Sequence, residues 1–451
     1  MDEETFKKYK KLGRGSWGKD LSLWKTMYNA FLTLIKAEEE FTPFALIKGE
    51  EKLNPFMEMF LNMFVRIPKA RKEGNPIIMH PFNYEPALFF AMNIAPIMQE
   101  TFSVGLAPLH INEPYIDLTN ELGYGDTPTL CNAQRPIVGA YMRGVAPIPD
   151  LMFFTSTPCN ALAMSYQVFQ QLINVPYFNM DIPYWAYDQT NEFYDEKIMD
   201  YMVKQNKELV SWLEKQTNQK LDEEKFQQTM KLVNEAREYI VEFNELLKNI
   251  PCPMPSIAGF GNFATMATSS GTPEAVKATK WIRDTAAENV KNGIAGVPDE
   301  KIRIAWPYTH IFFDQELLPW IEETFKAVVI LDILGYYPVL PHDVSTIEKC
   351  YESIAKGVLD FSMVGTCRGP AEYYTEFVLN YVQDYKIDAV IIPMQFACKH
   401  AYAITRIAAE AVREQLGIPT LIFGVDPYDS REVTSETIKE KISEFLTQVV
   451  L

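Results

Sequence analysis

Two distant stretches of the chain carry the same order of features, and this repeat constrains the fold more than any other property of the sequence. One reads DLMFFTSTPCNALAMSYQVFQQLINVPYFNMDIPY, from Asp150 to Tyr184, and the other reads DAVIIPMQFACKHAYAITRIAAEAVREQLGIPTLIFGVDPY, from Asp388 to Tyr428. Each runs from an aspartate through an apolar segment to a cysteine, then through a helical segment to a second apolar segment that follows a proline. Unbroken apolar strands separated by helices indicate a parallel sheet covered on both faces.

The rest of the chain predicts two α/β domains with helices before and between them. A chain of 451 residues exceeds what one core usually holds. Asp222 and Thr272 are predicted helix N-caps, the second followed by a proline at the first helical position. We expect two Rossmann-like or flavodoxin-like parallel-sheet domains at residues 76–190 and 301–451, an N-terminal helical region at 1–75, and a helical module, either a spacer or a lid, at 191–300.

Charge and hydropathy exclude several classes of partner. The chain has 42 Lys and Arg against 59 Asp and Glu, a formal net charge of −17. This charge repels phosphate backbones and anionic lipid. No apolar run reaches the roughly 18 residues of a membrane span, and the N-terminal MDEETFKKYKK lacks the apolar core of a signal peptide. We therefore expect a cytoplasmic protein that binds neither nucleic acid nor membrane.

Cysteine usage points to thiols or metal ligands. Six cysteines, none in close pairs, do not form the disulfide framework of a small secreted domain. With only five histidines in the chain, sulfur is the expected ligand of any metal.

Three of the cysteines are predicted to lie together at one site. Cys159 and Cys398 each follow an apolar strand and precede a helix, so they should lie at the carboxyl ends of strands, where ligands gather in parallel sheets. Cys131, in GDTPTLCNAQRPIVGAY, follows a turn and also precedes a helical stretch. Helix N-termini are expected to lower the pKa of these thiols. Three thiolates would hold three irons of a 4Fe-4S cube and leave the fourth open as a Lewis acid or electron donor.

Each cysteine also has a simpler interpretation, since a lone cysteine in an α/β protein is commonly a small buried hydrophobe. Cys252, in IPCPMPS, and Cys350, in STIEKCYESIAKGVL, are expected to be structural. Cys367, in MVGTCRGPAEYY, precedes a helix and would be able to approach the site, but a packed thiol is favoured there.

The segments around Cys131, Cys159 and Cys398 resemble the 2-hydroxyacyl-CoA dehydratase and benzoyl-CoA reductase subunits, a family of oxygen-sensitive iron–sulfur proteins. The similarity extends more loosely from about Gly74 to the C-terminus, whereas the first 70 or so residues match poorly. The matching segments are LCNAQRP, PDLMFFTSTPCNALAMSYQ, FACKHAYAITR and GIPTLIFGVDPYDSREVTSETIKEKISEFL.

The resemblance implies that Cys131, Cys159 and Cys398 ligate a 4Fe-4S cluster with one iron not ligated by a protein thiolate. It further implies a related second subunit, usually in a heterodimer, and a separate ATP-dependent iron–sulfur activator protein that supplies an electron. The expected reaction is the radical removal of water from an acyl-CoA substrate in an anaerobic setting. No phosphate-binding loop is visible, so this chain is not expected to hydrolyse ATP itself.

One acidic residue also matches the family pattern. Dehydratase subunits carry a Pro-Glu-Asn element after the first helix, and this chain reads APIMQETFSVG, which places Glu100 at the glutamate position. Its carboxylate would hold a hydroxyl or relay a proton, or it is structural. The chain departs from the pattern at the Ser/Thr-rich turn of the dehydratases, which reads MHPFNYEP here, with His80 and no serine or threonine.

Two other functions fit the same residues. The chain is alternatively a subunit of a benzoyl-CoA-reductase-like or other low-potential acyl-CoA reductase, or a non-catalytic partner whose cluster relays electrons. A double-cubane cluster of eight irons is disfavoured, because the region that would carry its extra cysteines reads YYPVLPHDVSTIEK. The sequence does not specify the acyl group.

Overall fold

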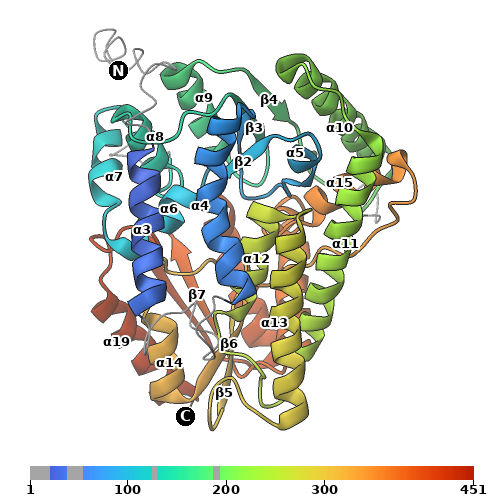
Figure 1. Ribbon diagram of the computed structural model, residues 1–451. Coiled ribbons are helices and arrows are strands. Elements are labelled where there is room, and N and C mark those ends of the chain that lie inside the picture. The colour runs from blue at the N-terminus through green and yellow to red at the C-terminus, as the bar shows by residue number, and fades with distance from the viewer. Residues whose placement is uncertain (1–20, 38–53, 124–129, 186–192, 451) are drawn as a thin grey trace.

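Two four-stranded parallel sheets form the centre of the computed structural model, which describes residues 21–37, 54–123, 130–185 and 193–450 (Figure 1). The first sheet has the order β2-β1-β3-β4 and contains β1 (Ile77–His80), β2 (Ala95–Met98), β3 (Leu151–Thr155) and β4 (Tyr177–Met180). The second has the order β6-β5-β7-β8 and contains β5 (Ile302–Trp306), β6 (Ala327–Asp332), β7 (Ala389–Gln395) and β8 (Thr420–Val425). The predicted α/β fold with two parallel sheets is confirmed.

The repeat in the sequence corresponds to a repeat in the structure. Asp150, which precedes β3, accepts a hydrogen bond through Oδ2 from the Ile77 N–H at 3.0 Å. Asp388, which precedes β7, accepts one through Oδ2 from the Arg303 N–H at 2.8 Å. Each aspartate therefore ties its own strand to the start of the neighbouring central strand, and the two sheets share their strand order because they are built from the same unit.

The N-terminal helices pack on the first sheet. Trp24 and Phe64 join them, with Trp24 Nε1 donating to the Phe64 carbonyl at 2.8 Å. The predicted amphipathic helices are thus present in the described part, while residues 1–20 and 38–53 lie outside it. The helices of this half are α3 (Ser22–Ala37), α4 (Pro55–Glu73), α5 (Ala87–Ala91), α6 (Thr101–Leu106), a 3-10 turn (Ala107–Leu109), α7 (Glu113–Asn120), α8 (Arg135–Met142) and α9 (Asn160–Ile173).

Two helices of the module between the sheets begin at the predicted N-cap residues. The Asp222 carboxylate accepts from the Lys225 N–H at 3.0 Å, and the Thr272 hydroxyl accepts from the Ala275 N–H at 3.2 Å, with Pro273 as the first helical residue. Both predicted N-caps are confirmed. The module contains α10 (Glu196–Thr217), α11 (Glu223–Leu246), α12 (Ala258–Ser269) and α13 (Pro273–Asn292), which run along one side of the molecule (Figure 1).

Helices cover both faces of the second sheet, and the last of them is the C-terminal helix. These helices are α14 (Leu317–Phe325), α15 (Ile347–Asp360), α16 (Val364–Cys367), α17 (Ala371–Asp384), α18 (Lys399–Ala411) with a π-helical turn (Val412–Leu416), and α19 (Ser435–Phe445) with a second such turn (Leu446–Val450). None of the helices in the described ranges is long and apolar enough to cross a membrane.

The buried apolar side chains explain why the strands of the first sheet show no polar alternation. In β3, Leu151 and Phe153 belong to one hydrophobic cluster and Met152 and Phe154 to another. Because successive strand residues point to opposite faces, both faces of the sheet are buried at β3, whereas the edge strand β4 is largely exposed. The first cluster continues through α10–α13 to the second sheet. The helical module is therefore part of the body that joins the sheets and not a detached lid, and the exact domain boundaries stay predictions.

A buried ion pair links the first sheet, the module and the second sheet. Arg237 of α11 donates to Glu85, in the loop after β1, from Nε at 3.2 Å and from Nη2 at 2.8 Å. The Tyr337 hydroxyl, after β6, also donates to Glu85. Arg237 Nη1 donates to Ser353 of α15 at 3.1 Å. Since a buried charge must be paired and hydrogen-bonded, this network fixes the loop after β1 relative to the loop after β6.

Candidate metal centre between the two sheets

A cavity of about 80 Å³ lies where loops from the carboxyl ends of both sheets meet. Its wall includes Glu100 after β2, Cys159 after β3, Tyr308 after β5, Cys398 after β7 and Tyr428 after β8. This volume is several times the roughly 10–15 Å³ that one water needs. Loops from both halves of the molecule therefore enclose one cavity at the carboxyl ends of the strands, where the sequence places Cys159 and Cys398.

All three cysteines predicted to form a site line this cavity. Cys131 lies in the loop before α8 and is buried. Cys159 is the N-cap residue of α9 and accepts a hydrogen bond through Sγ from the Leu162 N–H at 3.4 Å. Cys398 is the N-cap residue of α18. Three loops that are far apart in the sequence thus bring their thiols to one cavity.

The pKa values of Cys131 and Cys159 are raised, so the expectation of lowered values is wrong for these two thiols. Burial raises the pKa of Cys159 to about 12, and repulsion from the Cys398 sulfur adds to the shift. Burial likewise raises the pKa of Cys131 well above its usual value, and Cys159 and Cys398 raise it further. Burial outweighs the helix N-terminus here. A bound cation would reverse this balance, because coordinating thiols lose their protons.

The thiols supply the type of donor that an iron–sulfur cluster uses. Within the described ranges, no group of three or more His, Cys, Asp and Glu side chains is placed to hold one metal ion. A 4Fe-4S cube makes a different demand, since each thiolate binds a separate iron. Three cysteine thiols in one cavity wall, which also includes Glu100 and His400, are donors of the type that such a cube uses.

A fourth cysteine, Cys367, also lines the cavity. It ends the short helix α16, and its pKa is raised to about 12 by burial first and by Cys398 next. The sequence favoured a packed thiol at this position. The repeat offers the signal that was missed, because Cys131 and Cys367 each lie four residues before the helix, α8 or α17, that leads to β3 or β7.

The other two cysteines lie away from the cavity, in packed surroundings. Cys252 is 1 % exposed and its Sγ donates to the Met254 carbonyl at 3.3 Å. Cys350 of α15 is fully buried and its Sγ donates to the Val344 carbonyl at 3.7 Å. Both contacts are those of structural thiols, as the sequence analysis expects.

Glu100 lies in the cavity wall at the N-terminus of α6 and is only 5 % exposed. Its Oε2 accepts from the Phe82 N–H at 2.9 Å, and its Oε1 accepts from Gln134 Nε2 at 3.1 Å. Burial raises the pKa of Glu100 to about 7, and the hydrogen bonds oppose this shift only in part. A carboxyl that titrates near neutral pH is suited to proton transfer.

The segment MHPFNYEP contributes little to the cavity. Phe82 is its single residue in the wall. His80 is fully buried elsewhere, with Nδ1 2.9 Å from the Pro81 carbonyl oxygen, and burial lowers its pKa to about 3. His80 is therefore a neutral core residue.

Hydrogen bonds hold the Cys131 loop against the second sheet. Asn132 Nδ2 donates to Asp426 Oδ2 at 3.0 Å, and Asn112 Nδ2 donates to the Tyr428 carbonyl. Asp426 Oδ1 accepts from the Tyr428 N–H at 2.9 Å. The loop after β8 thereby fixes the position of Cys131 relative to the other half of the cavity.

Comparison with known protein families places these residues in context. Residues 82–449 match the family model described as 2-hydroxyglutaryl-CoA dehydratase, D-component. The chain belongs to this family. The matched range contains Glu100 and all six cysteines, and the family resemblance proposed from the sequence is confirmed.

Individual relatives have low sequence identity to this chain, but their alignments cover most of it. The (R)-phenyllactyl-CoA dehydratase alpha subunit of Clostridium sporogenes is 23% identical over 303 residues, 66% of this chain and 70% of that protein. The (R)-2-hydroxyglutaryl-CoA dehydratase subunit alpha of Acidaminococcus fermentans is 23% identical over 310 residues, 67% of this chain and 61% of that protein. The (R)-2-hydroxyisocaproyl-CoA dehydratase alpha subunit of Clostridioides difficile is 22% identical over 400 residues, 85% of this chain and 92% of that protein.

The buried carboxyl of Asp426 predicts a pH dependence of stability. Burial raises its pKa to about 7, whereas the unfolded value is about 3.9. The native state therefore keeps a proton that the unfolded chain releases, and the free energy of unfolding falls as the pH rises from about 4 through 7. Asp426→Asn should reduce this fall, because an amide keeps one acceptor oxygen for the backbone N–H groups of the loop and does not titrate. Urea unfolding at pH 5 and pH 8 measures the effect.

The matched control is Asp181→Asn, at the equivalent position of the first repeat, where the carboxyl is exposed. This substitution should leave the difference between pH 5 and pH 8 unchanged. An Asp426→Asn protein with the full wild-type fall would contradict the assignment.

Proposed function

We propose that the chain is the 4Fe-4S cluster subunit of an oxygen-sensitive, radical 2-hydroxyacyl-CoA dehydratase, which removes water from a CoA thioester after one-electron activation. The observation that carries the proposal is that Cys131, Cys159 and Cys398 line one cavity together with Glu100. Membership of the dehydratase family supports the reaction class. The three relatives compared above are themselves named as subunits of 2-hydroxyacyl-CoA dehydratases.

In this proposal, the chain supplies a protected place for the reaction. Cys131, Cys159 and Cys398 would each hold one iron, so the fourth iron would have no protein thiolate. When bound, such a cluster supplies a low-potential electron and an iron open to an oxygen of the substrate. Apolar side chains from both halves form much of the cavity wall, including Met98, Phe82, Phe263, Phe312 and Leu334, and they would limit the contact of a bound group with bulk water.

Glu100 would handle the proton. Loss of water requires a proton on the departing hydroxyl and the removal of a proton from the neighbouring carbon. At neutral pH, a carboxyl with a pKa of about 7 is present in both its acid and its base form. It would therefore donate a proton to the departing oxygen. The Phe82 N–H and the Gln134 amide fix the direction of the carboxyl.

A second subunit and an electron donor belong to the same proposal. The relatives are named as alpha subunits, which supports a related partner subunit for this chain. Exposed apolar side chains near α18 also support a partner, since Tyr184, Tyr402 and Ile407 are 58%, 48% and 51% exposed. By the family resemblance, an ATP-dependent iron–sulfur activator would deliver the electron, in an anaerobic cytoplasm.

Cys367 favours a second candidate function. A fourth thiol in the cavity wall would be able to bind the fourth iron, and an iron that carried this thiolate in addition to its three cluster sulfides would have no position open to substrate. In that case, the cluster would only relay electrons, and the chain would be a non-catalytic partner subunit. The two candidates differ in what the Cys367 sulfur does.

Removal of the Cys398 thiol should remove the cluster. Anaerobically purified wild-type protein should contain about four irons per chain. Cys398→Ser should lose most of them, whereas the matched control Cys350→Ser, at a buried thiol away from the cavity, should keep them. Iron analysis and visible absorption measure the outcome. Equal iron in both variants, or two or fewer irons in the wild type, would overturn the cluster assignment.

Replacement of Glu100 should separate proton transfer from cluster binding. Glu100→Gln keeps the size and an acceptor oxygen but cannot exchange a proton. The dehydration rate of the complete system should fall by about 10²- to 10⁴-fold, with the iron content unchanged. Turnover of a 2-hydroxyacyl-CoA panel, together with iron analysis, measures both. An unchanged rate would exclude a catalytic role for Glu100.

Cys367→Ser decides between the two candidate functions. If three cysteines hold the cluster, this variant should keep four irons and the electron paramagnetic resonance spectrum of the reduced wild type. If Cys367 binds the fourth iron, the spectrum should change and the iron content should fall as it does in Cys398→Ser. The second result would favour the electron-relay function.

A further inference from the structure

A second cavity, of about 90 Å³, adjoins the cavity that contains the cysteines. The two share four wall residues, which are Met98, Val104, Phe263 and Phe312. The outer part of the second cavity is formed by α3, α4, α6, α12, α14 and the loop after β5. It therefore lies next to the proposed reaction site but contains none of the cysteines.

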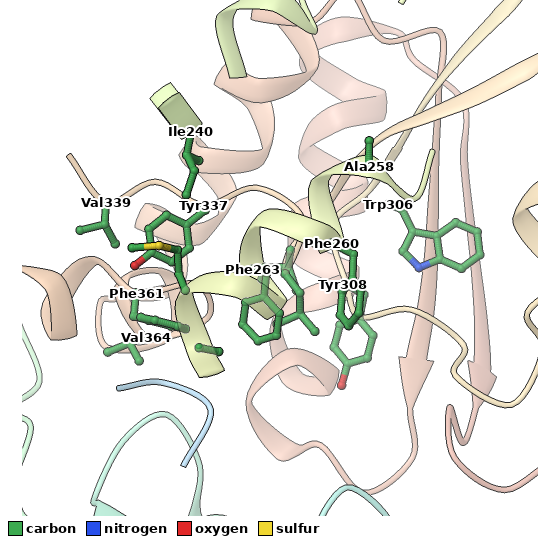
Figure 2. Packing of buried hydrophobic residues seen from close by; sticks show 14 of the residues in the cluster. Ile240, Ala258, Phe260, Phe263, Trp306, Tyr308, Tyr337, Val339, Phe361 and Val364 are labelled. Atoms are coloured by element: carbon green, nitrogen blue, oxygen red, sulfur yellow. The ribbon is translucent and has the colours of Figure 1, made fainter. Parts of the chain in front are cut away.

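The wall of this second cavity, called the apolar cavity below, is dominated by aromatic and aliphatic side chains. Phe31 and Phe60 come from the N-terminal helices, Phe260 from α12, Trp306 from β5 and Leu318 from α14. Figure 2 shows Phe260 and Phe263 projecting from one helix beside Trp306 and Tyr308. Side chains of this kind favour an apolar ligand.

Charge complementarity limits what the apolar cavity accepts. Among the described residues in its wall there is no lysine or arginine, and Asp314 is its acidic residue. His310, the basic side chain there, has Nε2 3.0 Å from Asp332 Oδ2. A ligand carboxylate would find no free cation in this wall, and burial of an unpaired carboxylate is strongly unfavourable.

An open groove next to the cysteine cavity indicates how the substrate would be oriented. This groove, of about 420 Å³, shares Cys367, Lys399 and His400 with the cysteine cavity. It shares no wall residue with the apolar cavity. The cysteine cavity thus lies between the groove and the apolar cavity, and a thioester that reacts at the cysteines would extend toward both.

We propose that the apolar cavity binds the acyl group of the substrate and selects a bulky, uncharged one, either a branched alkyl or an aryl group. The CoA part then remains in the open groove. This inference rests on the proposed function. The apolar cavity of about 90 Å³ is of the same order as the roughly 150 Å³ apolar cavity that accepts benzene, and the cysteine cavity remains for the cluster. A methyl group would leave most of that space empty.

One polar atom in the wall fits a reacting acyl group. Thr101 follows Glu100 and lines the apolar cavity, and it is 5 % exposed. Its Oγ1 has no hydrogen-bond partner among the described residues. Buried hydroxyls normally have a partner. If an acyl group extended from Glu100 into the apolar cavity, its oxygen would pass close to the Thr101 hydroxyl.

Equilibrium binding of CoA thioesters without a 2-hydroxyl tests the proposal independently of turnover. The probes are 3-phenylpropionyl-CoA, 4-methylpentanoyl-CoA, propionyl-CoA, glutaryl-CoA and free CoA, titrated calorimetrically into the anaerobic full-length protein with its partner subunit. The two bulky apolar probes should bind at least tenfold more tightly than propionyl-CoA, because each buried methylene adds affinity. Glutaryl-CoA should bind no better than propionyl-CoA. Equal affinities, or tighter binding of glutaryl-CoA, would overturn the proposal.

Two variants locate the binding. Ala264 lines the apolar cavity but not the cysteine cavity, so Ala264→Phe should weaken phenylpropionyl-CoA binding at least tenfold and leave propionyl-CoA binding unchanged. Ala264→Ser, which adds little volume, is the matched control. Leu318→Arg places a cation in the wall and should shift the preference toward glutaryl-CoA. An equal loss for all probes would place the acyl group elsewhere.

These outcomes are separable from failure of the proposed function. If the variants shift acyl preference but the protein holds no iron and does not dehydrate the panel, the apolar cavity is an acyl-binding site in a protein of different chemistry. If iron and dehydration are present but no variant changes the preference, the dehydratase function stands and this assignment falls.

Discussion

The site depends on two parallel sheets whose carboxyl ends face one cavity. In a parallel sheet, every loop that follows a strand emerges at the same edge, so residues far apart in sequence become neighbours there. Two such edges bring Cys131 and Cys159 from one half to Cys398 from the other. The Arg237–Glu85 pair and the Asn132–Asp426 hydrogen bond then hold the two halves in register. Without these contacts, no sequence motif would keep the three sulfurs around a common point.

Burial gives the cavity its chemical character. The same exclusion of water raises the pKa of Glu100 and of Asp426 to about 7 and that of Cys159 to about 12. The shifts favour the neutral forms of these groups, because a low-dielectric environment penalises charge. The Cys131 and Cys159 thiols would therefore lose their protons on binding a positively charged ligand. Glu100, in contrast, is balanced between its two forms, which is the property a proton donor needs.

Local signals in the sequence predicted the elements of the fold, whereas the cavity walls required the tertiary structure. The aspartates before β3 and β7, the caps at Asp222 and Thr272, and the cysteines at helix starts act within one turn or one strand pair, so the sequence carries them directly. Thiol pKa values could not be predicted in the same way, because burial is set by distant segments. The apolar cavity had no local signature either, since Phe31, Phe260 and Phe312 come from separate helices and loops. The repeat would have indicated that Cys367 lies at the site, but only through an alignment of the helix before β7 with the helix before β3.

The two halves are alike in topology but differ where they meet the cavity. In the second half, Asp426 and Tyr428 are buried and bonded to Asn132 and Asn112. The equivalent Asp181 and Tyr184 of the first half are exposed. A symmetric pair of closing loops would seal the cavity on both sides. Here the loop of the second half closes one side, while the Tyr184 hydroxyl lies 3.3 Å from Nε2 of His400, at the edge of the open groove. The exposed Tyr184 and the open groove thus mark the side from which a thioester with a large CoA group would reach the cavity.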